Sequence, residues 1–455
     1  MQPPRTNLAL SLIILAPLVN ACTLPGKVCI GDCDEQSDEG EGTVDGEAGG
    51  ETLTGGADES DASSDAELTT TSAMDSGDET GPAASCFVPD TDPPDLCGAF
   101  PAAVDFCFIF GSGGKFPQGI TSVLPAQLDG GGVDLLVAHP DGTVTAQSAV
   151  SEPVNDTPAK LWALDLPPGD HVLTSAGVFD EAAPIMVLGR LSGQTGGWTE
   201  IRTDGAGNAL AGQFHASDLE RHFGPVFVDW NQDDDLDLIE ILGSEGFWSI
   251  TIVTGEGDGN FTSKGGPIDD PEDARVALGA FGPGDATDDL VFVRSTGAVE
   301  ILGDLPDLAD SQKFDLGPDV LVHAVEVADL DGDARDDLVA LVDDTATATT
   351  SVRVALHADG FAQVAYPVVC GARALAIGRL DADDIPDIAV LGPNDTSLTI
   401  RRNDGNGGFN RTTSIDFFDP MDRLLVFDIT GDGRDDIVAA STIDGSWGFR
   451  QNGAP

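Results

Sequence analysis

Residues 325–341 read VEVADLDGDARDDLVAL, and this sequence is the clearest copy of a pattern that recurs along the chain. It contains two short apolar runs separated by an acidic turn, a pattern typical of two consecutive β-strands. The same plan recurs as VFVDWNQDDDLDLIEI at 226–241, LAIGRLDADDIPDIAVL at 375–391 and LVFDITGDGRDDIVAA at 425–440. Weaker copies lie at 123–138, 176–189 and 278–293. The chain is therefore an array of repeats, and the repeat period determines its architecture more strongly than any local motif does.

The repeats follow one another at a nearly constant interval. The residues just before each second apolar run are Asp134, Pro184, Asp237, Asp289, Asp337, Asp387 and Asp436, so the steps range from 48 to 53 residues. Each repeat has room for two more alternating segments, joined by Gly, Asn or Asp turns such as 358–360. Four short strands per repeat predict a propeller blade, so we expect an all-β, seven-bladed β-propeller over residues 104–455.

The two ends of the array predict how the propeller closes. The last repeat ends after its third strand, near residue 450, and lacks a fourth. Residues 104–110, VDFCFIF, form a strand candidate without a repeat of its own. We expect this N-terminal strand to complete the last blade, because closure removes open sheet edges. An open β-solenoid is the alternative.

The N-terminus predicts export. Residues 1–21 are typical of a lipoprotein signal peptide, because Arg5 precedes an apolar run, Leu8 to Val19, that is too short to span a bilayer. The run ends in LVNAC, which resembles a bacterial lipobox and predicts lipidation of Cys22. An ordinary cleaved signal, with Cys22 in a disulfide, is the alternative. Thr23 favours the outer membrane, by resemblance to lipoprotein sorting rules.

An acidic tether and a short connector precede the repeats. Residues 22–85 carry almost entirely negative charge, and no Lys or Arg occurs between Lys27 and Lys115. We expect a disordered linker that its own charge repulsion keeps extended. Residues 86–103 form a connector rich in Cys and Pro.

The seven cysteines indicate an oxidising compartment. Cys29 and Cys33 are close enough in sequence to form a disulfide, and so are Cys86 and Cys97. Cys107 and Cys370 are then left, and the sequence does not say how they pair.

The charge of the chain excludes several partner classes. Lys and Arg number 21 against 79 Asp and Glu, which gives a net charge of −58 over 455 residues. Nucleic acids and anionic lipid surfaces both require basic protein surface, so neither is an expected partner except through the lipid anchor. Metal cations and cationic partners remain.

The acidic turns predict cation sites. Their pattern, Asp-x-Asp/Asn/Thr-x-Asp-x-x-x-Asp, brings several oxygens to one point, and such carboxylates repel one another unless a cation lies between them. Oxygen ligands in a flexible loop favour calcium over zinc or copper. We name the turns after their repeats: turn 3 is 229–237, turn 5 is 329–337, turn 6 is 379–387 and turn 7 is 428–436.

The expected calcium ligands are side-chain oxygens at alternate positions and one main-chain carbonyl. Turn 5 offers Asp329, Asp331, Asp333 and Asp337 with the Arg335 carbonyl. Turn 7 offers Asp428, Thr430, Asp432 and Asp436 with the Arg434 carbonyl. Turn 3 offers Asp229, Asn231, Asp233 and Asp237 with the Asp235 carbonyl. Turn 6 has Asp381, Asp383 and Asp387, but Arg379 stands at its first ligand position, where a guanidinium can replace the ion. We expect about three calcium ions, which mainly pin one strand to the next.

The turns DLDGDARDD and DITGDGRDD resemble the FG-GAP/VCBS repeats of integrin α-type β-propellers. The resemblance covers residues 104–455 and is strong in repeats 3, 5 and 7, fair in repeat 6 and degenerate in repeats 1, 2 and 4. Many secreted bacterial lipoproteins look like this chain, with a signal, a lipobox, an acidic tether and a propeller. The resemblance implies a surface module that binds other molecules.

No catalytic motif is present in the sequence. Neither HExxH nor GxSxG occurs, and we expect His323 and most of the five Trp residues to be structural. We interpret the chain as a non-catalytic, calcium-stabilised, monomeric surface lipoprotein of the bacterial cell envelope that binds or adheres to a protein or polysaccharide. The alternative is a carbohydrate-directed protein, either a lectin or a polysaccharide lyase, although the single tyrosine, Tyr366, weighs against a Tyr/His lyase centre.

Overall fold

The computed structural model divides the chain into two compact units, which are described separately: Met1–Ala16 with Ala84–Pro455, and Pro17–Ala83. The described residues are 22–24, 27–29, 108–126, 134–147, 160–165, 171–180, 183–190, 197–203, 209–216, 220–228, 230, 237–244, 247–255, 261–269, 271, 273–282, 289–303, 310–381, 383, 385–392, 395–431 and 433–452. Every regular element among these residues is a β-strand, and none of them forms a helix able to cross a membrane.

The smaller unit contains one two-stranded antiparallel sheet. Strand β1 (Cys22–Leu24) pairs with β2 (Lys27–Cys29), and Cys22 lies opposite Cys29. A Pro-Gly pair separates the two strands in the sequence, and Pro followed by Gly favours a tight turn. The acid-rich remainder of the expected tether lies outside the described residues, so its disorder stays a prediction.

The larger unit contains seven four-stranded antiparallel sheets, numbered here after the repeats. Sheet 1 consists of β4 (Ser122–Ala126), β5 (Asp134–Ala138), β6 (Thr143–Gln147) and β7 (Lys160–Asp165). Sheet 2 consists of β8 (His171–Asp180), β9 (Ala183–Arg190), β10 (Gly197–Thr203) and β11 (Ala209–Ala216). Sheet 3 consists of β12 (Glu220–Val228), β13 (Asp237–Ser244), β14 (Phe247–Gly255) and β15 (Phe261–Ile268).

The remaining four sheets follow the same sequential order, with one exception. Sheet 4 consists of β16 (Ala274–Gly279), β17 (Asp289–Arg294), β18 (Ala298–Gly303) and β19 (Asp310–Asp315). Sheet 5 consists of β20 (Val320–Ala328), β21 (Asp337–Asp344), β22 (Thr349–Leu356) and β23 (Ala362–Pro367). Sheet 6 consists of β24 (Ala374–Gly378), β25 (Asp387–Leu391), β26 (Asp395–Arg402) and β27 (Arg411–Met421). Sheet 7 consists of β28 (Arg423–Phe427), β29 (Asp436–Ala440), β30 (Ser446–Asn452) and, out of order, β3 (Phe108–Lys115).

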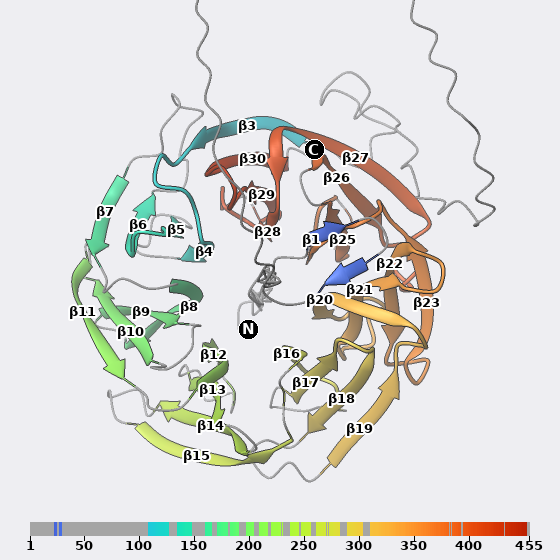
Figure 1. Cartoon of the computed structure of the whole chain (residues 1–455), viewed down its shortest axis with the longest axis horizontal. Coiled ribbons are helices and arrows are strands. Elements are labelled where there is room, and N and C mark those ends of the chain that lie inside the picture. Colours follow the sequence, from blue (N-terminus) through green and yellow to red (C-terminus); the bar gives the residue numbers. More distant parts are fainter. Residues whose placement is uncertain are drawn as a thin grey trace, which may run out of the picture. The chain divides into compact units, whose positions relative to one another are not determined.

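The sheets of this unit are arranged around a common centre, with the first strand of each sheet innermost and the last outermost (Figure 1). First strands of neighbouring sheets contact one another, as β4 does with β8, β8 with β12, and β16, β20, β24 and β28 in succession. For sheet 2 only the backbone is described, whereas the other six sheets also include described side chains. Four strands per sheet, stacked radially, are the architecture of a β-propeller.

The hydrophobic core is divided among the interfaces between sheets. Separate buried clusters join sheets 3 and 4, sheets 4 and 5, sheets 5 and 6, and sheets 6 and 7. The second strand of sheet 5, for example, is buried over Asp337–Val342, because both of its faces pack against neighbouring sheets. This two-sided burial explains why the second strands read as uninterrupted apolar runs rather than as alternating patterns.

The predicted closing strand is confirmed for its described part. Strand β3 pairs antiparallel with β30, so Phe108 lies opposite Asn452 and Lys115 opposite Ser446. Beyond β3, the Phe116 N–H donates to the Gly445 carbonyl at 2.9 Å. One buried cluster joins sheet 7 to sheet 1 and includes Ile120, Val137, Leu425 and Phe449. The N-terminal strand therefore completes the last sheet, next to the first repeat.

Candidate metal-binding turns

Each acidic turn connects the first strand of a sheet to the second. Turn 5 connects β20 to β21, and turn 7 connects β28 to β29. Both need backbone conformations that favour glycine: Gly332 has φ of 80° and Gly431 has φ of 74°. An added Cβ at either glycine would meet nothing within 4 Å, so the positive φ, and not lack of space, explains the residue choice. Ala334 adopts φ of 65° without being glycine.

Turn 5 brings three predicted ligands together. Carboxylate oxygens of Asp329, Asp331 and Asp333 lie within 4.8 Å of one another, and all three side chains reach solvent. The turn itself holds them in place, since Asp329 accepts hydrogen bonds from the N–H groups of Gly332 (2.8 Å) and Ala334 (3.0 Å). This arrangement offers a hard cation several oxygens from one short loop.

Turn 7 repeats the local geometry of turn 5. Asp428 accepts hydrogen bonds from the N–H groups of Gly431 (2.6 Å) and Gly433 (2.7 Å), as Asp329 does in turn 5. The predicted ligand oxygen Thr430 Oγ1 is buried and has no hydrogen-bond partner among the described residues. Asp432 lies outside them. A buried hydroxyl without a partner is unfavourable, and a bound cation would satisfy it.

The last acid of each turn has a role that the sequence did not reveal. Asp337 is fully buried, and its two oxygens accept hydrogen bonds from the N–H groups of Leu330 (2.9 Å) and His357 (2.6 Å). Asp436 accepts in the same way from Ile429 (3.1 Å) and Asn452 (2.7 Å). The N–H groups of Trp230 and Phe281 donate in the same way to Asp237 and Asp289. Each of these acids therefore closes its turn, meaning that it links the end of the turn back to its beginning. This structural task explains why the last acid persists in the degenerate repeat 4.

Burial and neighbouring charge act together on Asp337. The pKa of Asp337 is raised to about 7, because burial and, to a smaller extent, the carboxylates of Asp331 and Asp329 outweigh the lowering effect of the two backbone hydrogen bonds. Burial likewise raises the pKa of Asp336. Like charges in this turn therefore disfavour the ionised form, and a cation among them would reverse that effect.

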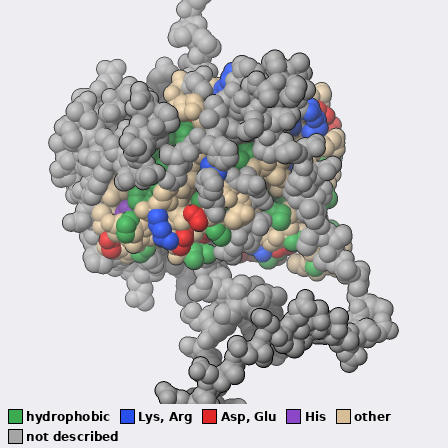
Figure 2. Space-filling view, turned by 90° about the horizontal axis from the view of Figure 1, so that it is seen from above, with side chains coloured by type: hydrophobic (Ala, Val, Ile, Leu, Met, Phe, Trp, Pro, Cys, Tyr) green, Lys and Arg blue, Asp and Glu red, His purple; other side chains and the backbone are tan. Residues whose placement is uncertain are grey.

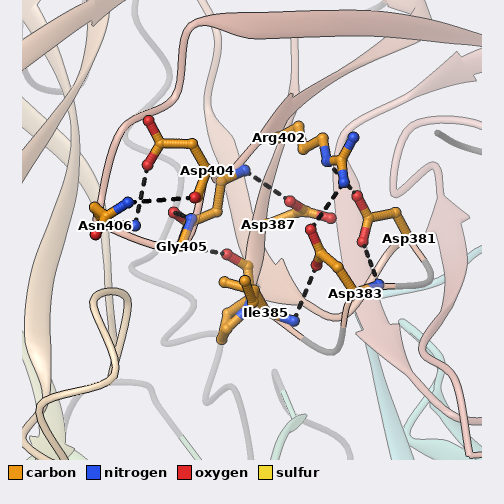
Figure 3. Close-up of polar contacts among 10 residues, drawn as sticks. Asp381, Asp383, Ile385, Asp387, Arg402, Asp404, Gly405 and Asn406 are labelled. Carbon is orange, nitrogen blue, oxygen red and sulfur yellow. Dashed lines mark hydrogen bonds and ion pairs between the residues drawn. The ribbon is translucent and has the colours of Figure 1, made fainter.

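Turn 6 contains a cation that belongs to the chain. Arg402, from the end of β26, places Nε 2.6 Å from Asp381 Oδ2 and Nη2 2.9 Å from Asp383 Oδ2. Figure 3 shows Asp381, Asp383 and Asp387 on the same side of the turn as the Arg402 guanidinium. Burial raises the pKa of Asp387 to about 8 and that of Asp381 to about 6, the latter against the lowering effect of Arg402.

Arg379 does not occupy the centre of turn 6, which corrects the expectation from the sequence. Its side chain points to the next sheet, where Nε lies 3.4 Å from Asp435 Oδ2. Its own N–H also donates to Asp435 Oδ2, at 2.7 Å. The matching pair between sheets 4 and 5 is Ala280 and Asp336, whose N–H and carboxylate are 2.8 Å apart. Adjacent sheets are therefore connected by Asp336 and Asp435, which directly precede the last acids of turns 5 and 7.

Several predicted residues lie outside the described part of the chain. Of the predicted ligands of turn 3, Asp237 is described, whereas Asp229, Asn231, Asp233 and Asp235 are not. The disulfide candidates Cys33, Cys86 and Cys97 also lie outside them, as does Cys107. Cys370 is disulfide-bonded.

His139, His323, Tyr366 and three of the tryptophans have structural surroundings. His139 is buried, with Nδ1 2.6 Å from the Gly119 carbonyl and Nε2 3.0 Å from Thr145 Oγ1. His323 lies within β20, and its Nε2 is 2.7 Å from Asp343 Oδ2. Tyr366 is buried against Phe409. Trp230, Trp248 and Trp447 are buried too, so these three offer no exposed ring for stacking on a sugar.

Several exposed basic side chains of the described surface form ion pairs with acidic ones. Figure 2 shows basic and acidic side chains next to one another on one face. Three such pairs are Lys115 with Asp444 (2.9 Å), Lys313 with Glu300 (2.7 Å) and Arg294 with Asp273 (3.4 Å). Solvent-exposed pairs of this kind contribute little to stability.

Comparison with known proteins shows the fold. No family model matches the chain, and no curated protein matches its sequence. The chain is similar to a solved structure described as "Crystal structure of BBS1N in complex with ARL6DN, soaked with mercury", with a TM-score of 0.50 and 11% identity, covering 77% of this chain and 98% of that chain. The form soaked with lead gives a TM-score of 0.49 and 12% identity at the same coverage. The predicted β-propeller of four-stranded blades is thereby confirmed.

Proposed function

We propose that the chain is a non-catalytic, calcium-stabilised binding module. Its seven sheets form one closed propeller of the FG-GAP/VCBS type, and a lipid on Cys22 anchors it to the bacterial outer membrane or cell surface. The observation that carries the proposal is the convergence of Asp329, Asp331 and Asp333 in a turn between two strands of a propeller sheet. This geometry supports a structural cation site at the edge of a rigid scaffold.

The donor set of the turns fits calcium. The three converging groups of turn 5 are carboxylates, and turn 7 adds the buried, unpartnered Thr430 Oγ1. Oxygen-only ligands in a loop rich in glycine and aspartate suit calcium, with an affinity on the order of 10⁻⁴ to 10⁻³ M outside the cell. In turn 5 the ion would be held by Asp329, Asp331 and Asp333, where it would neutralise their repulsion and stiffen the connection from β20 to β21.

A protein is the partner class that the observations favour. The similar BBS1N propeller was crystallised in complex with ARL6DN, so a propeller of this architecture can present a face to another protein. Carbohydrate recognition commonly uses exposed aromatic rings, and the three Trp side chains that are described are buried. Among the described large hydrophobic side chains the exposed aromatic one is Phe247, so the lectin or lyase alternative has a single phenylalanine ring in its favour.

A binding comparison on the native membrane tests the proposal. Full-length protein in its source cells, treated with a cross-linker in calcium, is expected to link reproducibly to one envelope protein, and chelation should abolish the link. A glycan array probed with the same protein in calcium should be blank. Saturable glycan binding, or cleavage of an acidic polysaccharide, would instead favour the carbohydrate-directed alternative.

The lipid anchor is tested separately. Cys22→Ala should move the protein out of the membrane fraction, and unchanged fractionation would contradict the lipid anchor.

A further inference from the structure

We propose that turn 6 is a cation site filled from within the chain, in which the Arg402 guanidinium takes the place of the divalent cation that turns 5 and 7 bind. This inference rests on the proposed calcium binding of those two turns. It explains why repeat 6 keeps its acids although the first ligand position is Arg379.

The backbone of turn 6 follows that of turn 5 at the middle ligand positions. The Asp333 N–H donates to Asp331 (3.1 Å), as the Asp383 N–H donates to Asp381 (2.9 Å). The Arg335 N–H donates to Asp333 (2.9 Å), and the Ile385 N–H donates to Asp383 in the same way (3.1 Å). The two turns thus build the same scaffold for these acids, and what differs is the group placed between them.

The position of Arg402 is specific to sheet 6. The last acid of turns 5, 6 and 7 accepts a hydrogen bond from the N–H of a residue at the end of the third strand or directly after it: His357 in sheet 5, Asn403 in sheet 6 and Asn452 in sheet 7. The residues just before these are Leu356, Arg402 and Gln451. Of these three positions only that of sheet 6 carries a permanently charged side chain, because a guanidinium stays protonated in proteins.

The contacts of Arg402 are those of a central cation. It bridges two carboxylates, of which Asp381 is only 2% exposed. The fully buried Asp387 has Oδ2 without a hydrogen-bond partner among the described residues (Figure 3). The corresponding Oδ2 atoms of Asp337 and Asp436 accept backbone N–H groups instead. Removing the guanidinium would leave the buried Asp381 and the neighbouring Asp383 without their counter-charge, and acidic oxygens in that situation recruit a cation.

The test compares calcium binding by full-length wild type and Arg402→Gln, which introduces the side chain that sheet 7 carries as Gln451. Calorimetric titration should give about one additional calcium ion per chain for the variant. In chelator the variant should melt below the wild type, and calcium should restore its melting temperature. A second substitution, Asp383→Asn, should remove the additional ion. Arg294→Gln removes a guanidinium paired with Asp273 away from the turns, and it should leave the number of ions unchanged.

The outcomes separate this inference from the proposed function. If the wild type binds calcium, loses an ion with Asp331→Asn, and Arg402→Gln gains none, the internal cation is overturned while calcium binding stands. If neither the wild type nor any variant binds calcium, the proposed function itself fails. Arg402→Lys keeps a positive charge in the turn, so it should fold and bind no additional ion. An additional ion in the lysine variant would overturn the inference.

Discussion

Asp337→Ala is expected to lower the free energy of unfolding by about 3 kcal/mol or more. The substitution leaves the N–H groups of Leu330 and His357 without their acceptor, at a position where Asp337 is fully buried. Each buried polar group left unpaired costs about 1–3 kcal/mol. Denaturant unfolding of the full chain in chelator measures this loss without any contribution from bound metal.

The control for Asp337 is an acid of the same sheet that makes no hydrogen bond across the acidic turn. Asp359 is exposed in the turn between β22 and β23, and Asp359→Ala should change stability by less than about 0.5 kcal/mol. If Asp337→Ala lost no more stability than this control, the turn-closing role of the last acid would be wrong. The same comparison would then weaken the explanation for the persistence of that acid in repeat 4.

Glu326→Gln is expected to stabilise the protein at neutral pH. Ala324 and Ala328 pack in the cluster between sheets 5 and 6, and Glu326 lies between them on the same face of β20, so its carboxyl enters apolar surroundings. Burial raises the pKa of Glu326 well above its ordinary value of 4.5. The folded protein therefore retains this proton at pH values where the unfolded chain has released it.

The sign of the pH dependence follows from that difference. Because the folded state binds more protons than the unfolded state above pH 4.5, stability falls as pH rises, by about 1.4 kcal/mol per pH unit until the folded pKa is reached. Glutamine cannot ionise, so Glu326→Gln should match the wild type near pH 4 and exceed it increasingly toward pH 7. The half-exposed Glu300, paired with Lys313, supplies the control Glu300→Gln. A constant difference between Glu326→Gln and the wild type across this range would contradict the account.

The sequence was sufficient to predict the architecture because the repeat spacing encodes it. The step of 48–53 residues and the acidic turns predicted sheets that open with a strand, an acidic turn and a buried strand, as in β20 and β21. The missing fourth strand near residue 450 predicted the pairing of β3 with β30. Both predictions depend on contacts that each repeat makes in the same way, which a single chain displays several times over.

The roles of individual charged residues could not be predicted in this way. Arg402 and Arg379 are both near the acids of turn 6 in the sequence, and only the register of β25 against β26 places Arg402 among them. The contact of Asp336 with Ala280 spans 56 residues and joins neighbouring sheets. Spacing within one repeat contains no information about such contacts, because they depend on how adjacent sheets stack.

Whether the acidic turns bind calcium is measured by a calorimetric titration of the full chain with calcium, after removal of metal with a chelator. The account predicts about three bound ions, one fewer in Asp333→Ala, and a melting temperature that rises on addition of calcium. No detectable binding, together with the same melting temperature in calcium and in chelator, would contradict it. The acidic turns would then be held by their internal hydrogen bonds alone.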